Sequence, residues 1–146
     1  PDVVVDFIAQ HHGTSLTKYF YSRALEEDRD GSISPDSFRY EGPKPQSKEV
    51  ALVMLADSVE AAIRSLQAPT EAKIKDMVKK IIKDKLNDGQ LEACDLTFKD
   101  LETITQSFCT ILEGIYHKRI EYPEVIVKEF ERRRENHGNP DNQPAE

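Results

Sequence analysis

Apolar residues recur at helical spacing along most of the chain. The segment from Val3 to Ile8 is apolar and leads to Gly13, which indicates the last turns of one helix. A second apolar face runs from Leu16 to Leu25, and Thr14 or Ser15 is expected to cap that helix. No useful length of chain alternates apolar and polar positions, and no internal repeat occurs. The pattern predicts an all-α fold.

Three further helices are expected in the second half of the chain. Ser47, Thr70 and Thr97 each precede a run with apolar residues at helical spacing, and each has a side chain suited to an N-cap. The Lys residues of the helix after Thr70 are expected to face solvent. The helix after Thr97 is expected to be broken at Pro123.

The end of the chain changes from amphipathic to polar. A last helix is expected over residues 125–135, after which the sequence is polar and rich in Asn and Pro. A chain of 146 residues is long enough for one domain with a sizeable core. We therefore expect residues 1–135 to form one helical domain and residues 136–146 to form a disordered tail.

Residues 26–47 are rich in Gly and Pro and are expected to form a long loop. The stretch from Glu26 to Ser37 superficially follows a calcium-binding EF-hand loop, with Gly31 at its sixth position. Ser37 occupies the twelfth position, where such a loop requires a bidentate Glu. We therefore expect a solvated turn with no useful affinity for calcium.

The charge and cysteine content exclude some classes of function. A net charge of -7 opposes binding to a nucleic-acid duplex, although a few cations in a cleft could still bind a small anion. Cys94 and Cys109 match no metal or disulfide spacing and are expected to be buried thiols in a reducing compartment. The longest apolar runs are too short to span a membrane.

Three side chains are candidates for metal chemistry. His11 and His12 are adjacent at the end of an apolar helix, where both can serve one site only because Gly13 frees the backbone. A surface pair of histidines remains the more common use of this spacing. Asp57 lies within an apolar run, where it is expected to contribute to a site, to pair with Arg64 or a Lys, or simply to lie exposed beside Glu60.

Three cations precede the helix that carries Asp57. Arg39, Lys44 and Lys48 lie close together in sequence, and two prolines stiffen the same segment. A helix N-terminus with nearby cations favours anion binding. A Pro-stiffened linker explains the same residues equally well.

Six strings together resemble a known family. They resemble, in order, the C-terminal half of the HD domain in membrane-anchored, seven-transmembrane HD hydrolases that degrade cyclic di-AMP. The resemblance covers residues 3–130, and its most specific part is HHGT followed by LADSVEAA. The strings are IAQHHGTSLTKYFYSRA, GPKPQSKE, LADSVEAAIRSL, DGQL, LTFKDLETI and YHKRIEYP.

The resemblance implies an HD-type helical bundle with a binuclear iron or manganese site. His11, His12 and Asp57 would be metal ligands that hold the attacking metal-bound water, and Arg39, Lys44 and Lys48 would lie near the substrate. The activity would be hydrolysis of cyclic di-AMP to the linear dinucleotide. The resemblance also implies a soluble domain at the cytoplasmic face of the membrane, held there through segments upstream.

The sequence also departs from the family pattern. It contains no adjacent His-Asp pair, so the remaining ligands are expected upstream of Pro1. We therefore expect His11, His12 and Asp57 to lie at an exposed surface, and this chain alone to be inactive. Apolar segments left without upstream partners would favour a homodimer. The alternative is a non-catalytic helical regulatory or interaction module that has lost its metal centre.

Overall fold

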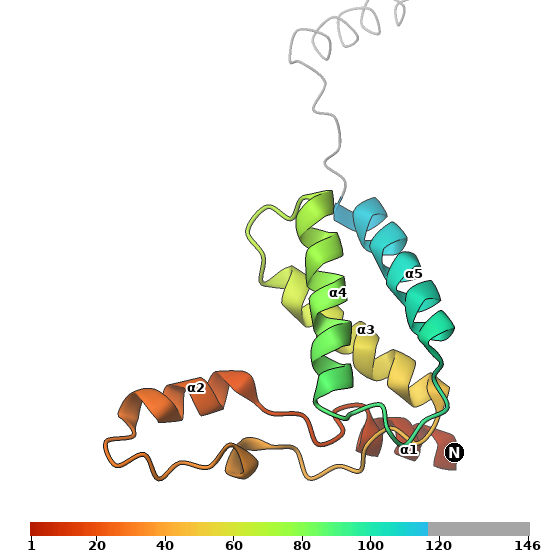
Figure 1. Cartoon of the computed structure of the whole chain (residues 1–146). Helices are drawn as coiled ribbons and strands as arrows, with labels where there is room; N and C mark the ends of the chain where they lie inside the picture. Colours follow the sequence, from red (N-terminus) through yellow and green to blue (C-terminus); the bar gives the residue numbers. More distant parts are fainter. Residues whose placement is uncertain (117–146) are drawn as a thin grey trace, which may run out of the picture. The chain divides into compact units, whose positions relative to one another are not determined.

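A computed structural model describes residues 1–116, which form five α-helices and one short 3-10 helix, η1 (Figure 1). The elements are α1 (Asp2–Gln10), α2 (Lys18–Glu27), η1 (Pro35–Phe38), α3 (Lys48–Arg64), α4 (Glu71–Asn87) and α5 (Phe98–Tyr116). The all-α prediction is confirmed. Within these residues the only β-type pairing is an isolated bridge between Leu16 and Arg39. The predicted break at Pro123, the helix over 125–135 and the tail over 136–146 lie outside the described residues.

The predicted starts of α3, α4 and α5 are confirmed. Ser47 and Thr70 each accept a hydrogen bond from the backbone N–H three residues later. Thr97 and Asp100 form a reciprocal pair, in which each side chain accepts from the backbone N–H of the other. This arrangement satisfies two of the N–H groups that a helix start leaves without partners. Local sequence therefore determines where these helices begin.

The predicted cap of α2 is wrong. This helix begins at Lys18 after Thr17, which makes no side-chain cap hydrogen bond. The backbone N–H of Thr14 donates instead to the Gln90 side chain at 2.9 Å. Ser15 accepts a hydrogen bond from Lys85 at 2.6 Å. Both candidate caps are thus held by partners that lie 76 and 70 residues away in sequence.

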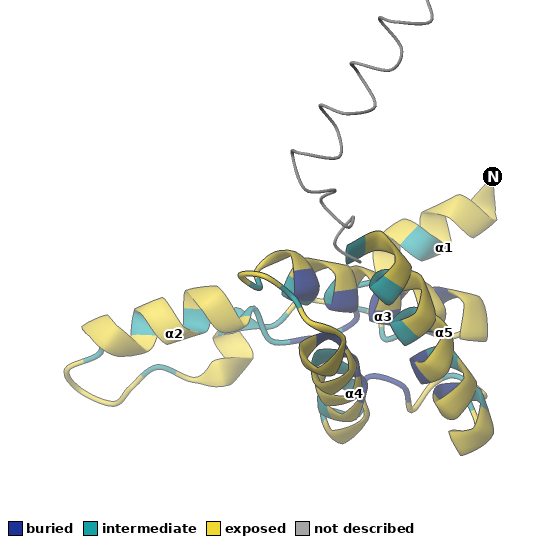
Figure 2. Cartoon of the chain, turned by 90° about the horizontal axis from the view of Figure 1, so that it is seen from above, coloured by how far each residue is buried: buried dark blue, intermediate teal, exposed yellow. Residues whose placement is uncertain are grey.

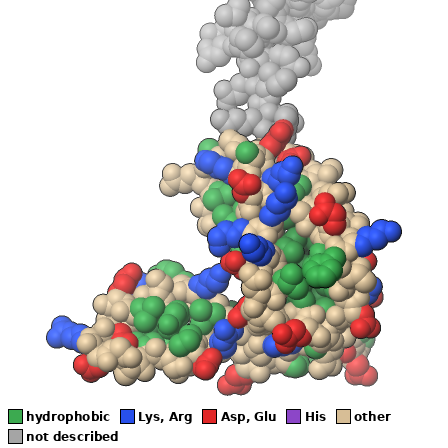
Figure 3. Space-filling model, in the orientation of Figure 1, with side chains coloured by type: hydrophobic (Ala, Val, Ile, Leu, Met, Phe, Trp, Pro, Cys, Tyr) green, Lys and Arg blue, Asp and Glu red, His purple; other side chains and the backbone are tan. Residues whose placement is uncertain are grey.

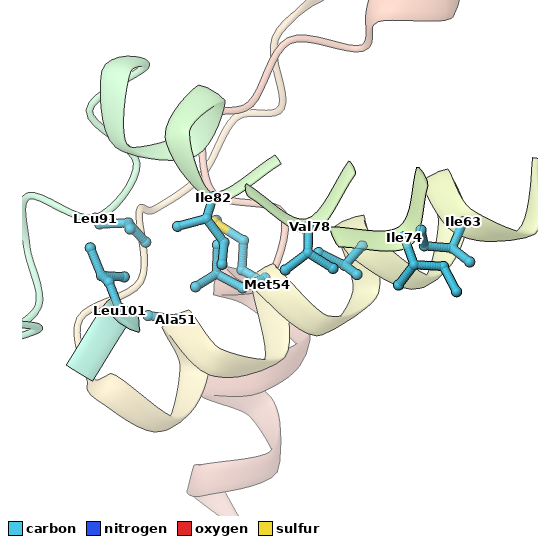
Figure 4. Close-up of a cluster of buried hydrophobic side chains, with 10 residues drawn as sticks. Ala51, Met54, Ile63, Ile74, Val78, Ile82, Leu91 and Leu101 are labelled. Atoms are coloured by element: carbon cyan, nitrogen blue, oxygen red, sulfur yellow. The ribbon is translucent and has the colours of Figure 1, made fainter. Parts of the chain in front are cut away.

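The core lies along one face of α3. This helix packs on α1 and α4, and α4 packs on α5. The predicted stripe of α3 is largely confirmed, although Leu52 is 41% exposed. The buried cluster, most of which is labelled in Figure 4, comprises Ala51, Met54, Leu55, Val59, Ile63, Ile74, Val78, Ile82, Leu91 and Leu101. Burial of these side chains stabilises the three-helix unit by the hydrophobic effect.

Much of α1 and α2 is exposed (Figure 2). On α1, Val3, Val5 and Ile8 are 58%, 61% and 69% exposed. This agrees with the expectation that the first apolar segment is left partly unpacked among the described residues. The same expectation is wrong for Leu55 and Val59 of α3, which are 0% and 2% exposed. Dimerisation stays a prediction. Among the described helices, none combines the length and the apolar character that crossing a bilayer would need.

A closed hydrogen-bond network joins the segment after α1 to the turn after α4. The Gln90 amide is fully buried, accepts from the N–H of Thr14 and donates to the Thr14 hydroxyl at 3.0 Å. It also donates to the Asp88 carboxylate at 3.0 Å. Asp88 in turn accepts two hydrogen bonds from the Arg39 guanidinium, at 3.1 and 2.9 Å. Arg39 closes the network by donating to the Thr14 carbonyl at 2.9 Å.

Gly13 allows this approach. Its φ is +56°, a backbone conformation that residues other than glycine rarely adopt. A Cβ at this position would lie 2.5 Å from the Gln90 Oε1 atom and 2.7 Å from the Met54 Cε atom. The backbone between His12 and Thr14 therefore packs against Gln90 and α3 more closely than any side chain would permit.

We predict that Gly13→Ala lowers the free energy of unfolding by about 2 to 4 kcal/mol, through backbone strain and steric overlap together. The control is Gly31→Ala, where φ is +64° but a Cβ would meet nothing within 4 Å. That variant should cost only about 1 kcal/mol. Urea denaturation measures both, and equal losses would show that packing around Gly13 is not tight.

We also predict that Gln90→Leu lowers the free energy of unfolding by about 1 to 3 kcal/mol, because it leaves the Thr14 N–H and the Asp88 carboxylate short of partners. Gln106→Leu is the matched control, since the Gln106 side chain is exposed and, among residues 1–116, bonds only to Glu102 in its own helix. The control should change stability by less than about 0.5 kcal/mol. A neutral Gln90→Leu would contradict the network's role.

Candidate functional site

His11 directly follows α1 as its C-cap residue, and its ring folds back onto the helix. Its Nδ1 atom lies 2.8 Å from the Phe7 carbonyl oxygen and 3.1 Å from that of Ile8. Carbonyl oxygens only accept hydrogen bonds, so Nδ1 carries the proton. In the neutral ring this leaves the Nε2 lone pair available. Metal-binding histidines commonly have this arrangement, with one ring nitrogen oriented by a carbonyl and the other on the metal.

The structure brings His12 and Asp57 together, although they lie ~45 residues apart in sequence. The His12 Nδ1 atom is 4.0 Å from Asp57 Oδ2, and the two side chains are 42% and 53% exposed. The proximity that the family resemblance implies for His12 and Asp57 is observed, and both side chains are exposed as expected. That His11, His12 and Asp57 share one site stays a prediction. The alternative partner for Asp57, Arg64, pairs instead with Glu60 at 3.4 Å. The His12 to Asp57 separation is too long for a hydrogen bond.

The chemistry of these side chains fits a divalent metal as part of a ligand set. Two atoms that each bind one ion at about 2 Å lie at most ~4 Å apart, which the His12 and Asp57 atoms satisfy. The ring of His11 is 3.9 Å from that of His12, measured between centroids. Within residues 1–116, however, no three His, Cys, Asp or Glu side chains are grouped closely enough to hold a metal. The ligand roles of the three residues stay predictions.

The surroundings of His12 favour its neutral form. Partial burial lowers the pKa of His12 below its ordinary value, and the neighbouring His11 and Lys85 lower it further, while Asp57 acts in the opposite direction. A neutral imidazole is the form that binds a metal. Tyr40 stacks on the His12 ring, with ring centroids 4.4 Å apart and planes inclined by 20°. Nothing in the local sequence pattern indicated Tyr40, because stacking across a loop leaves no local pattern.

The three cations expected near the substrate are each paired with a carboxylate. Arg39 binds Asp88 at 2.9 Å, which holds the loop in place. Lys44 and Lys48 pair with Glu92 at 3.1 Å and Asp100 at 3.0 Å. Neither lysine pair is deeply buried, so each is a weak surface interaction. The substrate-binding role of the three cations stays a prediction.

A cleft of about 530 Å³ lies where the start of α2 meets α3 and α4. Figure 3 shows Lys and Arg side chains beside carboxylates along this junction. Lys85 lines the cleft and is partly buried, so the expectation that the lysines of α4 face solvent is wrong at this position. Burial lowers the pKa of Lys85 below its ordinary value. The sequence spacing could have indicated that Lys85 is partly buried. Lys85 follows Ile82 by three residues, on the helix face that Ile74, Val78 and Ile82 bury.

The acidic turn is held by its own backbone. The Asp28 carboxylate accepts hydrogen bonds from the N–H groups of Asp30, Ser32 and Ile33. These bonds lower the pKa of Asp28 below its ordinary value. The solvated turn expected from the sequence is the observed structure.

Comparison with known proteins identifies the relatives of this chain. No protein-family model matches it. It is 54% identical over 128 residues to the cyclic-di-AMP phosphodiesterase PgpH of Bacillus subtilis, and 47% identical over 124 residues to PgpH of Listeria monocytogenes. These matches cover 88% and 85% of this chain but only 18% and 17% of the relatives. The chain therefore spans about a fifth of the length of these curated relatives.

Solved structures show the same relationship. The HD domain of L. monocytogenes PgpH in complex with cyclic-di-AMP has a TM-score of 0.77 and 46% sequence identity to this chain. The match covers 84% of this chain and 56% of that one. A second crystal structure of the same HD domain gives a TM-score of 0.74 at 45% identity. This chain is therefore homologous to part of the HD domain of the PgpH cyclic-di-AMP phosphodiesterases.

Proposed function

We propose that these residues are part of a metal-dependent phosphodiesterase that hydrolyses cyclic di-AMP to the linear dinucleotide. The observation that carries the proposal is the approach of His12 to Asp57 within 4.0 Å, in a chain 54% identical to a PgpH protein. Two L. monocytogenes structures of the same HD domain, one with cyclic-di-AMP, support the same assignment. We further propose that residues 1–135 belong to this domain, and that a membrane anchor elsewhere in the intact protein holds it at the cytoplasmic face.

His11, His12 and Asp57 are the proposed metal ligands. Homology to an HD-domain phosphodiesterase implies a divalent metal, and we propose a binuclear iron or manganese site. The chemistry that such metals supply when bound is activation of water and neutralisation of charge on the phosphodiester. The protein's contribution is to hold the metal-binding side chains in place. The Phe7 carbonyl orients His11, and Tyr40 and the packing of Gly13 orient His12.

Arg39, Lys44 and Lys48 are proposed to support substrate binding, Arg39 by positioning the loop and the two lysines by contacting phosphate. Arg39 holds the loop through Asp88 and Thr14, so its contribution is to position the segment next to His12. Lys44 and Lys48 are bound only by carboxylates that lie at the surface. A phosphate oxygen could replace either partner at small cost, because exposed ion pairs contribute little.

The non-catalytic alternative is compatible with one observation, which part of an enzyme with further ligands elsewhere would share. Within residues 1–116 no group of three metal-binding side chains is assembled. A regulatory or interaction module that has lost its metal centre would have this property. Metal content of the intact protein distinguishes the two proposals, since only the enzyme retains tightly bound manganese or iron.

We predict that His12→Ala and Asp57→Asn each lower cyclic di-AMP hydrolysis by the intact, manganese-loaded protein at least about 100-fold, because each removes a proposed metal ligand. Bound manganese should fall in parallel, as measured by elemental analysis. Asp95→Asn is the matched control, since Asp95 is exposed and forms no salt bridge within the described residues.

Retention of both turnover and manganese by His12→Ala would refute the proposed ligand set. The isolated 146-residue chain should be assayed beside the intact protein and is expected to be inactive. Metal-dependent turnover by the isolated chain would contradict the expectation that further ligands are required.

A further inference from the structure

Lys85 differs from the other cations of the cleft at the junction of α2, α3 and α4. Lys18 pairs with Asp84 at 3.0 Å, and Arg39 pairs with Asp88 at 2.9 Å. Lys85 lies in the same cleft, yet it forms no salt bridge with any described residue. Its one side-chain hydrogen bond within residues 1–116 is donated to the Ser15 hydroxyl at 2.6 Å.

A partly buried ammonium with one neutral acceptor is incompletely satisfied. The group has three donors, and Ser15 accepts only one of them. Removing a charge from water without a counter-charge costs free energy. Of the three cations that line the cleft, Lys85 is the one without a salt bridge to a described residue, although the carboxylates of Asp88 and Asp57 act on it at longer range. An anion bound in the cleft would compensate that charge.

The position and shape of the cleft indicate what kind of anion would fit. Ser58 in its wall follows Asp57 in α3, so the cleft adjoins the proposed metal ligands. Leu16 and Ile81 add apolar surface, and Asn87 adds an amide. Its volume of about 530 Å³ is within the range of ~300 to 1,000 Å³ typical of small-molecule sites. An anion with an attached apolar ring matches these walls better than a bare ion.

We propose that this cleft is a nucleotide subsite in which Lys85 binds a phosphate oxygen, with the Ser15 hydroxyl beside it. Naming the ligand as one half of a cyclic dinucleotide rests on the proposed function. Lys85 thereby has a role distinct from Arg39, Lys44 and Lys48, because its charge is not committed to a carboxylate of the described chain.

The first test measures binding without metal or turnover. Adenosine 5′-monophosphate is titrated calorimetrically into the intact protein in EDTA, using wild type, Lys85→Gln, Lys85→Arg and Lys83→Gln. Lys83 is the matched control because it lies on the same helix but is exposed. Loss of a charge-assisted hydrogen bond should weaken binding by about tenfold in Lys85→Gln. Lys83→Gln should bind as wild type does, and Lys85→Arg within about threefold of it.

A second measurement needs no variant. Amide chemical shifts of the wild-type protein should move with adenosine 5′-monophosphate at Ser15, Ser58 and Asn87, which line the cleft. Excess inorganic phosphate should reverse the shifts. Shifts confined to residues outside the cleft, no binding by wild type, or equal affinity in Lys85→Gln would each overturn the subsite.

Turnover separates this inference from the proposed function. With manganese and cyclic di-AMP, Lys85→Gln should raise KM about tenfold while kcat changes less, because the subsite binds substrate away from the reacting centre. An unchanged KM in an active enzyme would overturn the subsite alone. Absence of turnover by the wild type would contradict the proposed function, and the nucleotide titration would then decide the subsite independently.

Discussion

The buried amide of Gln90 is the interaction on which the rest of the site depends. It holds the Thr14 backbone and hydroxyl against the turn after α4, with Asp88 and Arg39 completing the network. Polar groups this deeply buried are strongly constrained, because each unmade hydrogen bond costs more than a made one contributes. The network thus fixes the end of α1 relative to α3 and α4. His12 meets Asp57 as a result.

The site shows how an acidic protein can offer a local place for an anion. The net charge of -7 describes the whole surface, whereas most cations near His12 are neutralised one by one by carboxylates. The Arg39 pair holds the loop between α2 and α3, and a cation paired with a carboxylate contributes little net electrostatic field. Lys85 alone among the cleft cations has no such partner within the described residues. Local pairing, rather than net charge, determines where an anion can bind.

Homology and geometry support each other at different scales. The PgpH relatives establish the HD-domain ancestry of 88% of the chain, and the matched region is 18% of the B. subtilis protein. The structure adds the orientation of the two histidine rings, which sequence identity alone does not provide. His11 presents one ring nitrogen while the other is held by Phe7, and Tyr40 covers the face of His12. Both contacts restrict ring rotation, as expected for side chains whose orientation matters to a ligand.

The sequence by itself determined the helices and the candidate ligands. Periodicity predicted the buried stripes of α3 and α4, and Ser47, Thr70 and Thr97 preceded the starts of α3, α4 and α5, because these features act within one or two helical turns. On α5 the same spacing was not sufficient, since Ile111 and Ile115 are 59% and 67% exposed. The pairing of His12 with Asp57 was expected from the family resemblance, and the structure bears out their proximity.

Only the tertiary structure decided which distant groups meet. Thr14 and Ser15 are good caps by local rules, yet they bond instead to Gln90 and Lys85, which lie 76 and 70 residues away in sequence. Tertiary folding likewise paired Arg39 with a carboxylate and left Lys85 without a salt bridge to any residue of the described range 1–116. Periodicity reports which face of a helix is buried, but it does not report which charge will lie opposite. That depends on how separate elements pack, which no local pattern encodes.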